Sequence, residues 1–279
     1  METELAIGIS VVILTFNSDK SIETTLLAAK SVSDDIHVVD SFSTDRTEEI
    51  VRAAGAHFYQ HGFVNYGAQR NWAIDNLPLR HGWELHLDAD ERPSPDLVQQ
   101  LRALTAASVE GVDGFLIPRL SFFLGRAIRH GGMYPIWHCR LFRRGKGRCE
   151  NRLYDQHFYV EGMTSRIEAP FIDDVRMPLA EWSVRHVRWS EAEVDELLSI
   201  EKSARIQGKW TGNAVERQRQ RKSLYYRAPC FLRAFLFFIY LYVFLAGFLD
   251  GKEGLIFFVL QSFWFRFLID AQIYERKRA

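Results

Sequence analysis

Short apolar strand patterns alternate with helical patterns through the first 120 residues, and this alternation constrains the fold more than any other feature of the chain. β-Branched and apolar runs predict strands at residues 9–14, 35–40, 56–60 and 83–88. Helical patterns predict helices at residues 20–31, near 66–76 and at 95–104. A further helix is expected after Asp45, with Ile50, Val51 and Ala54 on one face and Ser43, Thr44 or Asp45 as its cap. Strand–helix alternation with short connections is typical of a mostly parallel sheet with helices on both faces, so we predict an α/β fold.

The pattern changes beyond residue 112. Short strand candidates at 113–118, 139–143 and 157–161 are separated by Gly-rich turns, with no obvious long helix before residue 187. This favours one α/β core with a mixed second half over two independent domains. Ser190-Glu-Ala-Glu193 matches a capping box, which predicts a helix that begins there and runs to about residue 206.

Composition excludes several classes of protein. With 47% apolar residues, 25% charged residues and equal numbers of cations and anions, 35 each, the chain can bury a core and lacks the basic excess of duplex-DNA binders. Its three cysteines form no CxxC pair, and no P-loop, HExxH or GxGxxG motif occurs. The N-terminus lacks a basic secretory region, so we expect a reduced, cytosol-facing protein.

The C-terminal part differs in kind from the rest. Between Arg217 and Leu249 there are six cations and no carboxylate, and residues 234–249 and 255–265 are two apolar, aromatic-rich runs. The first run is roughly 24 Å long as a helix, shorter than the roughly 30 Å hydrocarbon core. A basic stretch leading into an apolar hairpin favours insertion into a membrane surface. A membrane-spanning hairpin and a pair of buried core helices are the alternatives.

Asp88-Ala89-Asp90 follows the fourth predicted strand at its carboxyl end, where ligands bind in open parallel sheets. Carboxylates two positions apart project to the same side of an extended chain and can face one divalent cation. Oxygen ligands suit Mg²⁺ or Mn²⁺, which would neutralise charge on a departing diphosphate. Solvated loop carboxylates give the same triplet by chance, but Asp40 at the end of an earlier strand strengthens the interpretation.

Four segments give the chain a family resemblance. They are Ser10-Val-Val-Ile-Leu-Thr-Phe-Asn17, Val38-Val-Asp-Ser-Phe-Ser-Thr-Asp-Arg-Thr47, Gln69-Arg-Asn71 and Leu87-Asp-Ala-Asp-Glu91. In this order and spacing they resemble the family 2 (GT-A fold) glycosyltransferases, and most of all the lipopolysaccharide-core and exopolysaccharide β-glucosyltransferases. The resemblance implies a GT-A core over 1–189, with a nucleotide-sugar half (1–120) and an acceptor half (121–189). A helical, basic and hydrophobic membrane-associating tail would follow over 190–279.

The resemblance also implies roles on the donor side. Thr15 and Asn17 would line the base pocket, and Asp40 would accept a hydrogen bond from the uracil N–H. Gln69, Arg70 and Asn71 would lie next to the nucleotide-sugar, and Arg70 is a candidate to bind its diphosphate. Asp88 would contact the ribose or the metal, Ala89 would line the donor site, and Asp90 would bind the metal. As alternatives, Asp40 is a helix cap and Arg70 forms a surface ion pair.

The acceptor side is less well defined. Transfer with inversion needs a carboxylate base, and Asp155 in the segment 150–157 is the first candidate, with Glu150 the second. Close relatives often carry Val-His-Glu where this chain has Tyr154-Asp155-Gln156. His186 is a possible third metal ligand or a packed histidine. The Gly- and aromatic-rich segment 131–137 is a sugar platform or plain core.

The expected activity is metal-dependent, inverting transfer of a hexose, first of all glucose, from a UDP-sugar to a lipid-linked glycan or lipopolysaccharide acceptor. Mg²⁺ or Mn²⁺ would be the cofactor, and no nucleic acid is expected as a partner. The enzyme would be peripheral or monotopic at the cytoplasmic face of the inner membrane. Three alternatives remain: transfer to polyprenyl phosphate, nucleotidyl transfer, and a non-catalytic membrane scaffold with a degenerate fold.

Overall fold

The computed structural model describes residues 6–151, 156–198, 211 and 214–278. The chain forms two compact units. Unit 1 comprises the residues up to Arg119 together with 137–150 and 157–176, and unit 2 comprises 120–136, 151–156 and the chain from Met177 onward. Because the chain returns twice to unit 1, the units are not successive halves. The division at residue 189 stays a prediction, and helix α5 (Leu179–Leu198) runs across that position.

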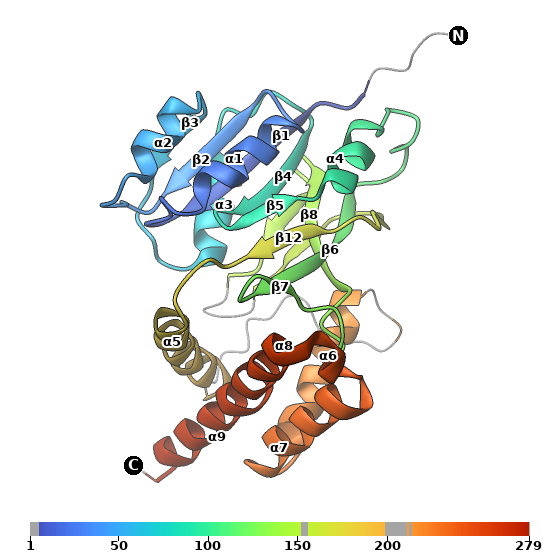
Figure 1. Cartoon of the computed structure of the whole chain (residues 1–279). Helices are drawn as coiled ribbons and strands as arrows, with labels where there is room; N and C mark the ends of the chain where they lie inside the picture. The colour runs from blue at the N-terminus through green and yellow to red at the C-terminus, as the bar shows by residue number, and fades with distance from the viewer. Residues whose placement is uncertain (1–5, 152–155, 199–210, 212–213, 279) are drawn as a thin grey trace. The chain divides into compact units, whose positions relative to one another are not determined.

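The main sheet is mixed and has the strand order β3-β2-β1-β4-β8-β6-β12-β5, with β7 and β11 paired to β6 (Figure 1). A separate two-stranded sheet pairs β9 with β10. The strands are β1 (Ile9–Thr15), β2 (Ile36–Asp40), β3 (His57–Gln60), β4 (Trp83–Asp88), β5 (Glu91–Pro93), β6 (Gly114–Phe123), β7 (Arg126–Ala127), β8 (Ile136–Arg143), β9 (Gly147–Cys149), β10 (Phe158–Val160), β11 (Thr164–Arg166) and β12 (Phe171–Asp174). Strand β1 is parallel to both β2 and β4, and β2 is parallel to β3. Strand β8 is antiparallel to β4. The predicted α/β fold with a mixed second half is confirmed.

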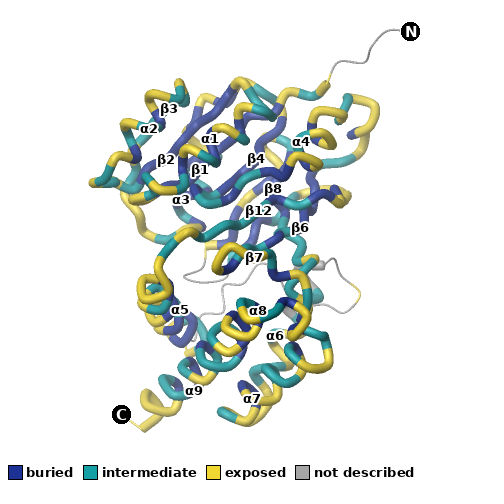
Figure 2. Tube along the Cα trace, in the orientation of Figure 1, coloured by how far each residue is buried: buried dark blue, intermediate teal, exposed yellow. Residues whose placement is uncertain are grey.

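The strand register brings three carboxyl ends together. In the parallel pairs, Thr15 of β1 lies opposite Asp40 of β2, and Leu14 of β1 lies opposite Asp88 of β4. The apolar residues of these strands are fully buried, as the continuous hydrophobic runs predict for a parallel sheet covered on both faces (Figure 2). The polar strand ends therefore meet at one edge of the sheet.

Alternate side chains of β1 supply two different cores. Val11 and Ile13 pack in the larger hydrophobic cluster with residues of α1, α2 and α4, whereas Val12 and Leu14 pack in a second cluster with residues of α3. This is the two-residue period of a strand with both faces covered. The helices of unit 1 are α1 (Ile22–Lys30), α2 (Thr47–Ala53), α3 (Tyr66–Asn76) and α4 (Pro95–Arg102).

Side-chain caps fix where two of these helices begin. The Ser94 hydroxyl accepts from the Leu97 N–H at 3.1 Å, and Pro95 occupies the first turn of α4. The Asn65 side-chain oxygen Oδ1 accepts from the Ala68 N–H at 2.8 Å at the start of α3. At α2, the expected cap residue Asp45 accepts from the Thr47 N–H at 3.0 Å, although the helix itself begins at Thr47.

Unit 2 is largely helical. Its helical segments are α5 (Leu179–Leu198), α6 (Ala214–Arg227), α7 (Leu232–Ile239), the π-helical η1 (Tyr240–Phe244), the 3₁₀ turn η2 (Gly247–Asp250), α8 (Gly251–Phe257), the π-helical η3 (Phe258–Trp264) and α9 (Phe265–Arg276). The prediction that a helix begins at Ser190 is wrong. The helix already begins at Leu179, and the Ser190 hydroxyl donates to the Val187 carbonyl at 2.7 Å, inside the helix. The predicted end near residue 206 lies outside the described residues.

Within unit 2, the segment 126–136 is fixed to the turn between the two apolar helices. The Asp250 carboxylate accepts from the backbone N–H groups of Arg129 and His130 at 3.1 and 2.9 Å, and from His130 Nδ1 at 2.6 Å. The buried Phe258 ring leaves no room for a Cβ at Gly131, where the nearest ring atom would lie at 2.2 Å. Gly131, with a φ of +63°, is thus required both by its backbone conformation and by this contact.

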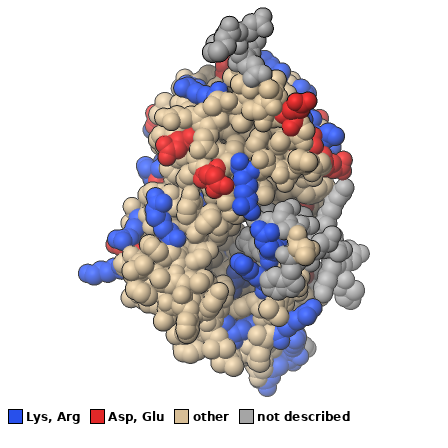
Figure 3. Space-filling model, turned by 90° about the vertical axis from the view of Figure 1, so that its right-hand side faces the viewer, with Lys and Arg blue, Asp and Glu red and all other residues tan. Residues whose placement is uncertain are grey.

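The two apolar helical arms, which we call the hairpin (residues 232–276), are tied together by a buried ion pair. Arg233 Nε donates to Asp270 Oδ1 at 2.8 Å, and the Asp270 carboxylate also accepts from the Phe231 N–H at 2.7 Å. The outer faces of the hairpin remain exposed (Figure 2). On the face drawn in Figure 3, Lys and Arg side chains border a wide area without charged groups.

Candidate functional site

The candidate site lies at the carboxyl ends of β1, β2 and β4 in unit 1, where the sheet register places Thr15, Asp40 and Asp88 side by side. Thr15 is buried, and its hydroxyl has no hydrogen-bond partner among the described residues. A buried hydroxyl without a partner is unusual, and a ligand group could satisfy it. This is compatible with the predicted base pocket, which stays a prediction.

Asn17 connects the loops that follow β1 and β2. Its backbone has a φ of +46°, a left-handed conformation that asparagine tolerates better than most residues. Its N–H donates to the Ser43 hydroxyl at 2.8 Å, and its side-chain oxygen accepts from the Thr44 N–H at 2.9 Å. The two loops thereby form one polar rim, so both of the segments that the resemblance singled out meet at this point.

Asp40 is fully buried at the end of β2. Its carboxylate accepts from the Ser43 N–H at 2.8 Å and from the Ser43 hydroxyl, and from Gln60 Nε2 at 3.5 Å. These contacts order the turn after β2, and Asp40 caps no helix. Its role towards a uracil ring stays a prediction.

Gln69 and Asn71 hold neighbouring segments of the chain in place. Gln69 Nε2 donates to the His61 carbonyl at 3.0 Å and to the Ser41 hydroxyl at 3.2 Å. Asn71 makes a reciprocal pair with the backbone of Cys149, donating at 2.9 Å and accepting at 2.9 Å. The structure thus gives both residues positioning contacts, one at the β2 edge and one at β9.

Arg70 lies between them on α3 and is buried at the end of β4. Its Nη1 donates to the Leu87 carbonyl at 3.0 Å, and its Nη2 donates to Asp88 Oδ1 at 2.5 Å. The alternative of a surface ion pair is wrong, because the Arg70 side chain is only 4% exposed. The structure therefore brings Arg70 and the acidic triplet together, as the resemblance implied.

A second buried arginine reaches the same carboxylate from β8. Arg140 Nη2 lies 3.4 Å from Asp88 Oδ2 and 2.5 Å from Glu91 Oε1, and Glu91 Oε2 accepts from the Asp88 N–H at 3.0 Å. We call Arg70, Asp88, Glu91 and Arg140 the Asp88 clamp. Asp88 is its most accessible member, with 34% of its side chain exposed.

The clamp sets the charge of Asp88. Burial opposes ionisation of this carboxyl group, but the adjacent guanidinium groups of Arg70 and Arg140 outweigh it and lower the pKa of Asp88. Burial raises the pKa of Glu91 to about 8, although Arg140 counteracts the shift. Asp88 is therefore the ionised acceptor of the cluster at neutral pH.

Ala89 and Asp90 form the turn after β4. The Ala89 carbonyl accepts from the Thr25 hydroxyl at 2.9 Å, and the Asp90 carbonyl accepts from the Asp174 N–H at 3.1 Å. Asp90 borders a small polar pocket, lined by Ser21, Thr24, Thr25, Asp90, Arg92, Asp174 and Arg176. Of the two carboxylates in this lining, Asp174 is ion-paired with Arg92 at 3.2 Å and with Arg176 at 2.9 Å. The metal role of Asp90 stays a prediction.

His186 lies on helix α5 in unit 2. Its Nδ1 donates to the Trp182 carbonyl at 2.8 Å, its ring stacks on Trp182 at 3.5 Å, and the Gln261 side chain forms a further hydrogen bond. Burial lowers the pKa of His186 to about 4, so the ring is neutral. These contacts favour the packed-histidine alternative, and the metal-ligand role stays a prediction.

The structure describes one of the two candidate bases, Glu150. Asp155 lies outside the described residues. Glu150 is buried at the end of β9 and accepts from the His157 N–H at 3.1 Å, while its own N–H donates to the His157 carbonyl at 3.0 Å. Glu150 is thus paired with His157 within unit 1, and the identity of the base stays a prediction.

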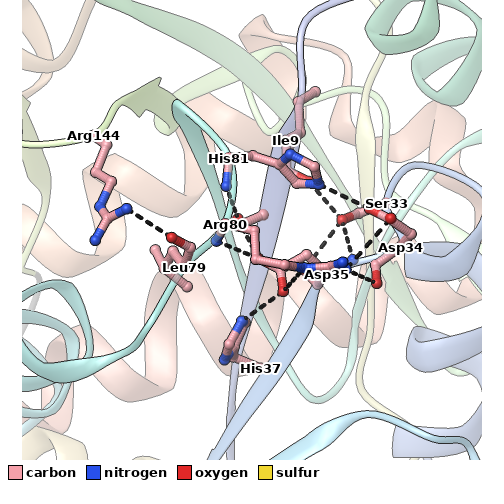
Figure 4. A network of polar contacts seen from close by, with 10 residues as sticks. Ile9, Ser33, Asp34, Asp35, His37, Leu79, Arg80, His81 and Arg144 are labelled. Atoms are coloured by element: carbon pink, nitrogen blue, oxygen red, sulfur yellow. Dashed lines mark hydrogen bonds and ion pairs between the residues drawn. The ribbon is translucent and has the colours of Figure 1, made fainter.

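A group of potential metal ligands that the sequence did not single out lies at the opposite, amino end of the sheet. Asp35, His37 and His57 offer ligand atoms that lie within 4.8 Å of one another. Figure 4 shows that Asp35 is already occupied: it accepts from Arg80 Nε at 3.0 Å and from the Arg80 N–H at 2.9 Å, and it contacts His37 Nε2 at 3.0 Å. A guanidinium on the same carboxylate disfavours a cation here, so we interpret the group as a structural network.

Four residues at the site were not assigned a role from sequence. Phe16 and Phe42 are exposed on the loops after β1 and β2, and Glu91 and Arg140 complete the clamp. For Arg140, the only signal was a cation within the strand pattern of residues 139–143. For Phe42, the left-handed φ of +61° appears only in three dimensions.

Carboxylates at the ends of parallel strands in an α/β sheet are the arrangement that the resemblance to the family 2 (GT-A fold) glycosyltransferases led us to expect. Residues 10–146 match the family model described as glycosyl transferase family 2, so this part of the chain is a domain of that family. The lipopolysaccharide core biosynthesis glycosyltransferase LpsC of Rhizobium meliloti is 34% identical over 119 residues, which cover 41% of this chain and 43% of that protein.

Further matches were found among curated proteins and among solved structures. An uncharacterized glycosyltransferase of Rickettsia bellii is 32% identical over 99 residues, covering 36% of this chain and 33% of that protein. Both matches thus span less than half of the relative's own length. Among solved structures, glucosyl-3-phosphoglycerate synthase from Mycobacterium tuberculosis, in complex with Mn²⁺, UDP and glucosyl-3-phosphoglycerate, is 23% identical with a TM-score of 0.33, covering 42% of this chain and 44% of that one.

Proposed function

We propose that the protein is a metal-dependent, inverting glycosyltransferase that moves a hexose, first of all glucose, from a UDP-sugar to a lipid-linked glycan. The acceptor would belong to the synthesis of bacterial lipopolysaccharide or another surface polysaccharide. The observation that carries the proposal is the acidic triplet 88–90 at the end of β4, beside the ends of β1 and β2, in a family 2 domain.

On the donor side, the proposal gives Asp40 the uracil N–H and Asp88 the ribose or the metal. Thr15, Asn17, Gln69, Arg70, Asn71 and Ala89 would line the nucleotide-sugar site. Asp90, which borders a small polar pocket, would hold Mg²⁺ or Mn²⁺ through its carboxylate. When bound, the ion would stabilise the charge that develops on the leaving diphosphate. Arg70, buried against β4, adds a fixed positive charge to the same region.

Inversion requires a base on the acceptor side. We assign this role first to Asp155 and second to Glu150, because both lie in the segment that follows β9. A carboxylate there would take the proton of the attacking hydroxyl while the diphosphate leaves. Variants of both residues can decide between them by their effect on transfer.

The acceptor is proposed from unit 2. Its hairpin exposes large apolar side chains on both arms, including Leu236, Tyr240 and Phe244, the last of which is 75% exposed. The helical segment Gly247–Arg276 is long and apolar enough to cross a membrane. An exposed aromatic face next to basic residues favours an anionic lipid surface. We therefore propose a peripheral or monotopic enzyme at the cytoplasmic face of the inner membrane, which agrees with the name of the relative LpsC.

The proposal is tested with the purified chain and a panel of UDP-glucose, UDP-galactose and GDP-mannose, each with Mn²⁺ or with EDTA. A ligand at about 100 times its Kd stabilises the native state by about 2.7 kcal/mol. We expect a UDP-sugar to raise the melting temperature by about 5 °C in the presence of Mn²⁺, together with slow release of UDP. The absence of any metal-linked stabilisation across the panel would contradict the proposal.

A further inference from the structure

The first arm of the hairpin (Leu232–Phe244) presents an apolar stripe to the solvent. Its exposed side chains recur at helical spacing and are Leu232, Phe235, Leu236, Tyr240, Val243 and Phe244. The sequence carries no charged residue from Ala234 to Leu249. Monomeric soluble proteins rarely expose a continuous apolar face of this kind, so the stripe indicates an interaction surface.

The second arm, formed by α8, η3 and α9, continues the same surface. Its exposed side chains include Leu255 and Phe267. The ring centres of Phe231 and Phe267 are 5.1 Å apart, and those of Phe235 and Phe263 are 6.5 Å apart. The outer faces of the two arms therefore adjoin.

Helix α5 lies along the second arm, and both belong to unit 2 (Figure 1). The His186 side chain forms a hydrogen bond with the side chain of Gln261, and further along α5 the Asp195 carboxylate forms an ion pair with Arg276. Between these two contacts, Val194 packs in one buried cluster with residues of α9. Helix α5 and the second arm thus run side by side from Gln261 to Arg276.

The exposed side of α5 is charged. Glu181, Arg188 and Glu191 lie on one face of the helix by their spacing, and all three are exposed. If the second arm crossed the hydrocarbon core, α5 beside it would carry these charges into the core. Charged side chains at that depth are costly unless they face a bundle interior or an aqueous cavity. The contact with α5 therefore opposes a membrane-spanning second arm, although its length would permit one.

Exposed cations lie at both ends of the second arm. Residues 275–278 carry three cations against one carboxylate, and all four are exposed. At the turn, Lys252 is exposed, and so is Arg129, whose N–H donates to Asp250 at 3.1 Å. Cations close to an anionic bilayer attract its headgroups. Cations at both ends of an apolar face fit a helix pair that lies in the plane of such a surface.

We propose that the hairpin lies flat in one leaflet of an anionic bilayer, with its outer face about 5–10 Å deep at the boundary between headgroups and acyl chains. Helix α5 stays on the aqueous side, and neither arm crosses the bilayer. The inference rests on the proposed function for the membrane itself. It deepens that proposal by naming the side chains that face lipid and by excluding the spanning hairpin that the sequence left open.

The test places single cysteines in the full chain after Cys230, the exposed one of the three cysteines, is replaced by serine. Lys252→Cys and Lys277→Cys mark the two ends of the second arm, and Leu236→Cys marks the stripe. The protein is added to sealed vesicles of phosphatidylglycerol and phosphatidylcholine. Because a flat hairpin keeps both ends outside, we expect a membrane-impermeant maleimide to label Lys252→Cys and Lys277→Cys completely. A fluorophore at Leu236→Cys should be quenched by a nitroxide attached near the headgroup end of the acyl chain.

Glu191→Cys is the matched control, since it carries the same fluorophore on the exposed side of α5. It should show no quenching by the lipid nitroxide. Protection of either end of the second arm from the maleimide, or lipid quenching at Glu191→Cys, would show that an arm crosses, and the inference would be wrong while membrane association stood.

A second copy of the chain is the other possible occupant of the stripe. Dimers that bury the Leu236→Cys probe, without any binding to vesicles, would overturn both the inference and the proposed membrane association. Donor binding is measured separately with UDP and Mn²⁺, so a failure of the proposed transfer chemistry is distinguishable from either result.

Discussion

Two buried arginine–carboxylate clusters, one in each unit, differ in how completely their hydrogen bonds are satisfied. In the hairpin of unit 2, Arg233 donates to Asp270 and to the Tyr226 carbonyl, and the same carboxylate accepts from the Phe231 N–H. In unit 1, the Asp88 clamp leaves the Asp88 side chain 34% exposed and Arg140 Nε without a partner among the described residues. The hairpin cluster is closed, whereas the clamp has capacity for a ligand.

This difference indicates which cluster serves function. A buried ion pair contributes little net stability over apolar residues of the same size, but loss of one partner is strongly destabilising. A closed pair such as Arg233–Asp270 therefore specifies how two helices pack. An open cluster has polar groups that the protein leaves without partners. At the end of a parallel strand, these groups lie where ligands bind in such sheets.

The largest effect is expected at the open cluster. Asp90→Ala should reduce transfer at least about 10³-fold, equivalent to about 4 kcal/mol of transition-state stabilisation, because it removes the proposed metal ligand. The melting temperature should change little, since Asp90 borders a pocket and is not part of a core cluster. Transfer at the wild-type rate would show that Asp90 is not needed for the reaction.

The closed cluster should respond in the opposite way. Asp270→Asn leaves the buried Arg233 without its counter-charge and should destabilise the hairpin by about 3 kcal/mol. UDP binding, measured by calorimetry at a temperature where the variant is folded, should be unchanged. A variant that kept its stability but lost UDP affinity would reverse our assignment of the two clusters.

A third buried carboxyl group, which has no arginine in contact, sharpens the comparison. Glu84 contacts only His86, at 3.1 Å, among the ion pairs of the described residues, and burial raises its pKa to about 7. Because the folded pKa lies above the unfolded value of 4.5, the folded state holds the extra proton. Stability should therefore fall as the pH rises from about 4.5 to 7.

The variant Glu84→Gln removes this titration. Relative to the wild type, it should gain about 2 kcal/mol of unfolding free energy between pH 5 and pH 8. Urea denaturation at several pH values measures the difference. His186, whose pKa is lowered to about 4, contributes the opposite slope between about 4 and 6.5 in both proteins and cancels in the comparison. If the unfolding free energies of the wild type and Glu84→Gln changed with pH in the same way, the raised pKa of Glu84 would be contradicted.

The smallest effect is expected at the outer face of the hairpin. Replacement of Phe235 or Phe244 by Ser should weaken sedimentation with anionic phospholipid vesicles about tenfold each, since burial of a phenylalanine side chain contributes about 1.5 kcal/mol. Leu27→Ser, which changes an exposed apolar residue on α1, is the control and should have no effect. Equal vesicle binding by all variants would remove the hairpin from the proposed membrane surface.

Sequence reasoning located the parallel half of the sheet well. Buried parallel strands consist of continuous apolar runs, and the strands of residues 9–15 and 83–88 are of this kind. Helix α5 was placed too late because Ser190 and Glu193 imitate a capping box, whereas both are buried inside the helix. A local capping pattern at Ser190 cannot reveal that α5 has already begun about three turns earlier, at Leu179.

At the site, the resemblance implied that Arg70 and Asp88 both serve the nucleotide-sugar, but it did not predict their ion pair or the clamp. The contact of Arg140 with Asp88 depends on the register between β4 and β8, which a connection of almost 50 residues separates along the chain. Similarly, the position of His186 followed from a helix that had been placed too late. Contacts set by long-range pairing, and the direction of single side chains, require the folded structure.

The most direct test of the central claim is calorimetry of UDP with the wild-type chain, first with Mn²⁺ and then with EDTA in excess. If the acidic end of β4 holds a divalent ion against the diphosphate, Mn²⁺ should tighten UDP binding at least about tenfold, or 1.4 kcal/mol. Equal UDP affinity in both conditions, or no UDP binding in either, would contradict the account.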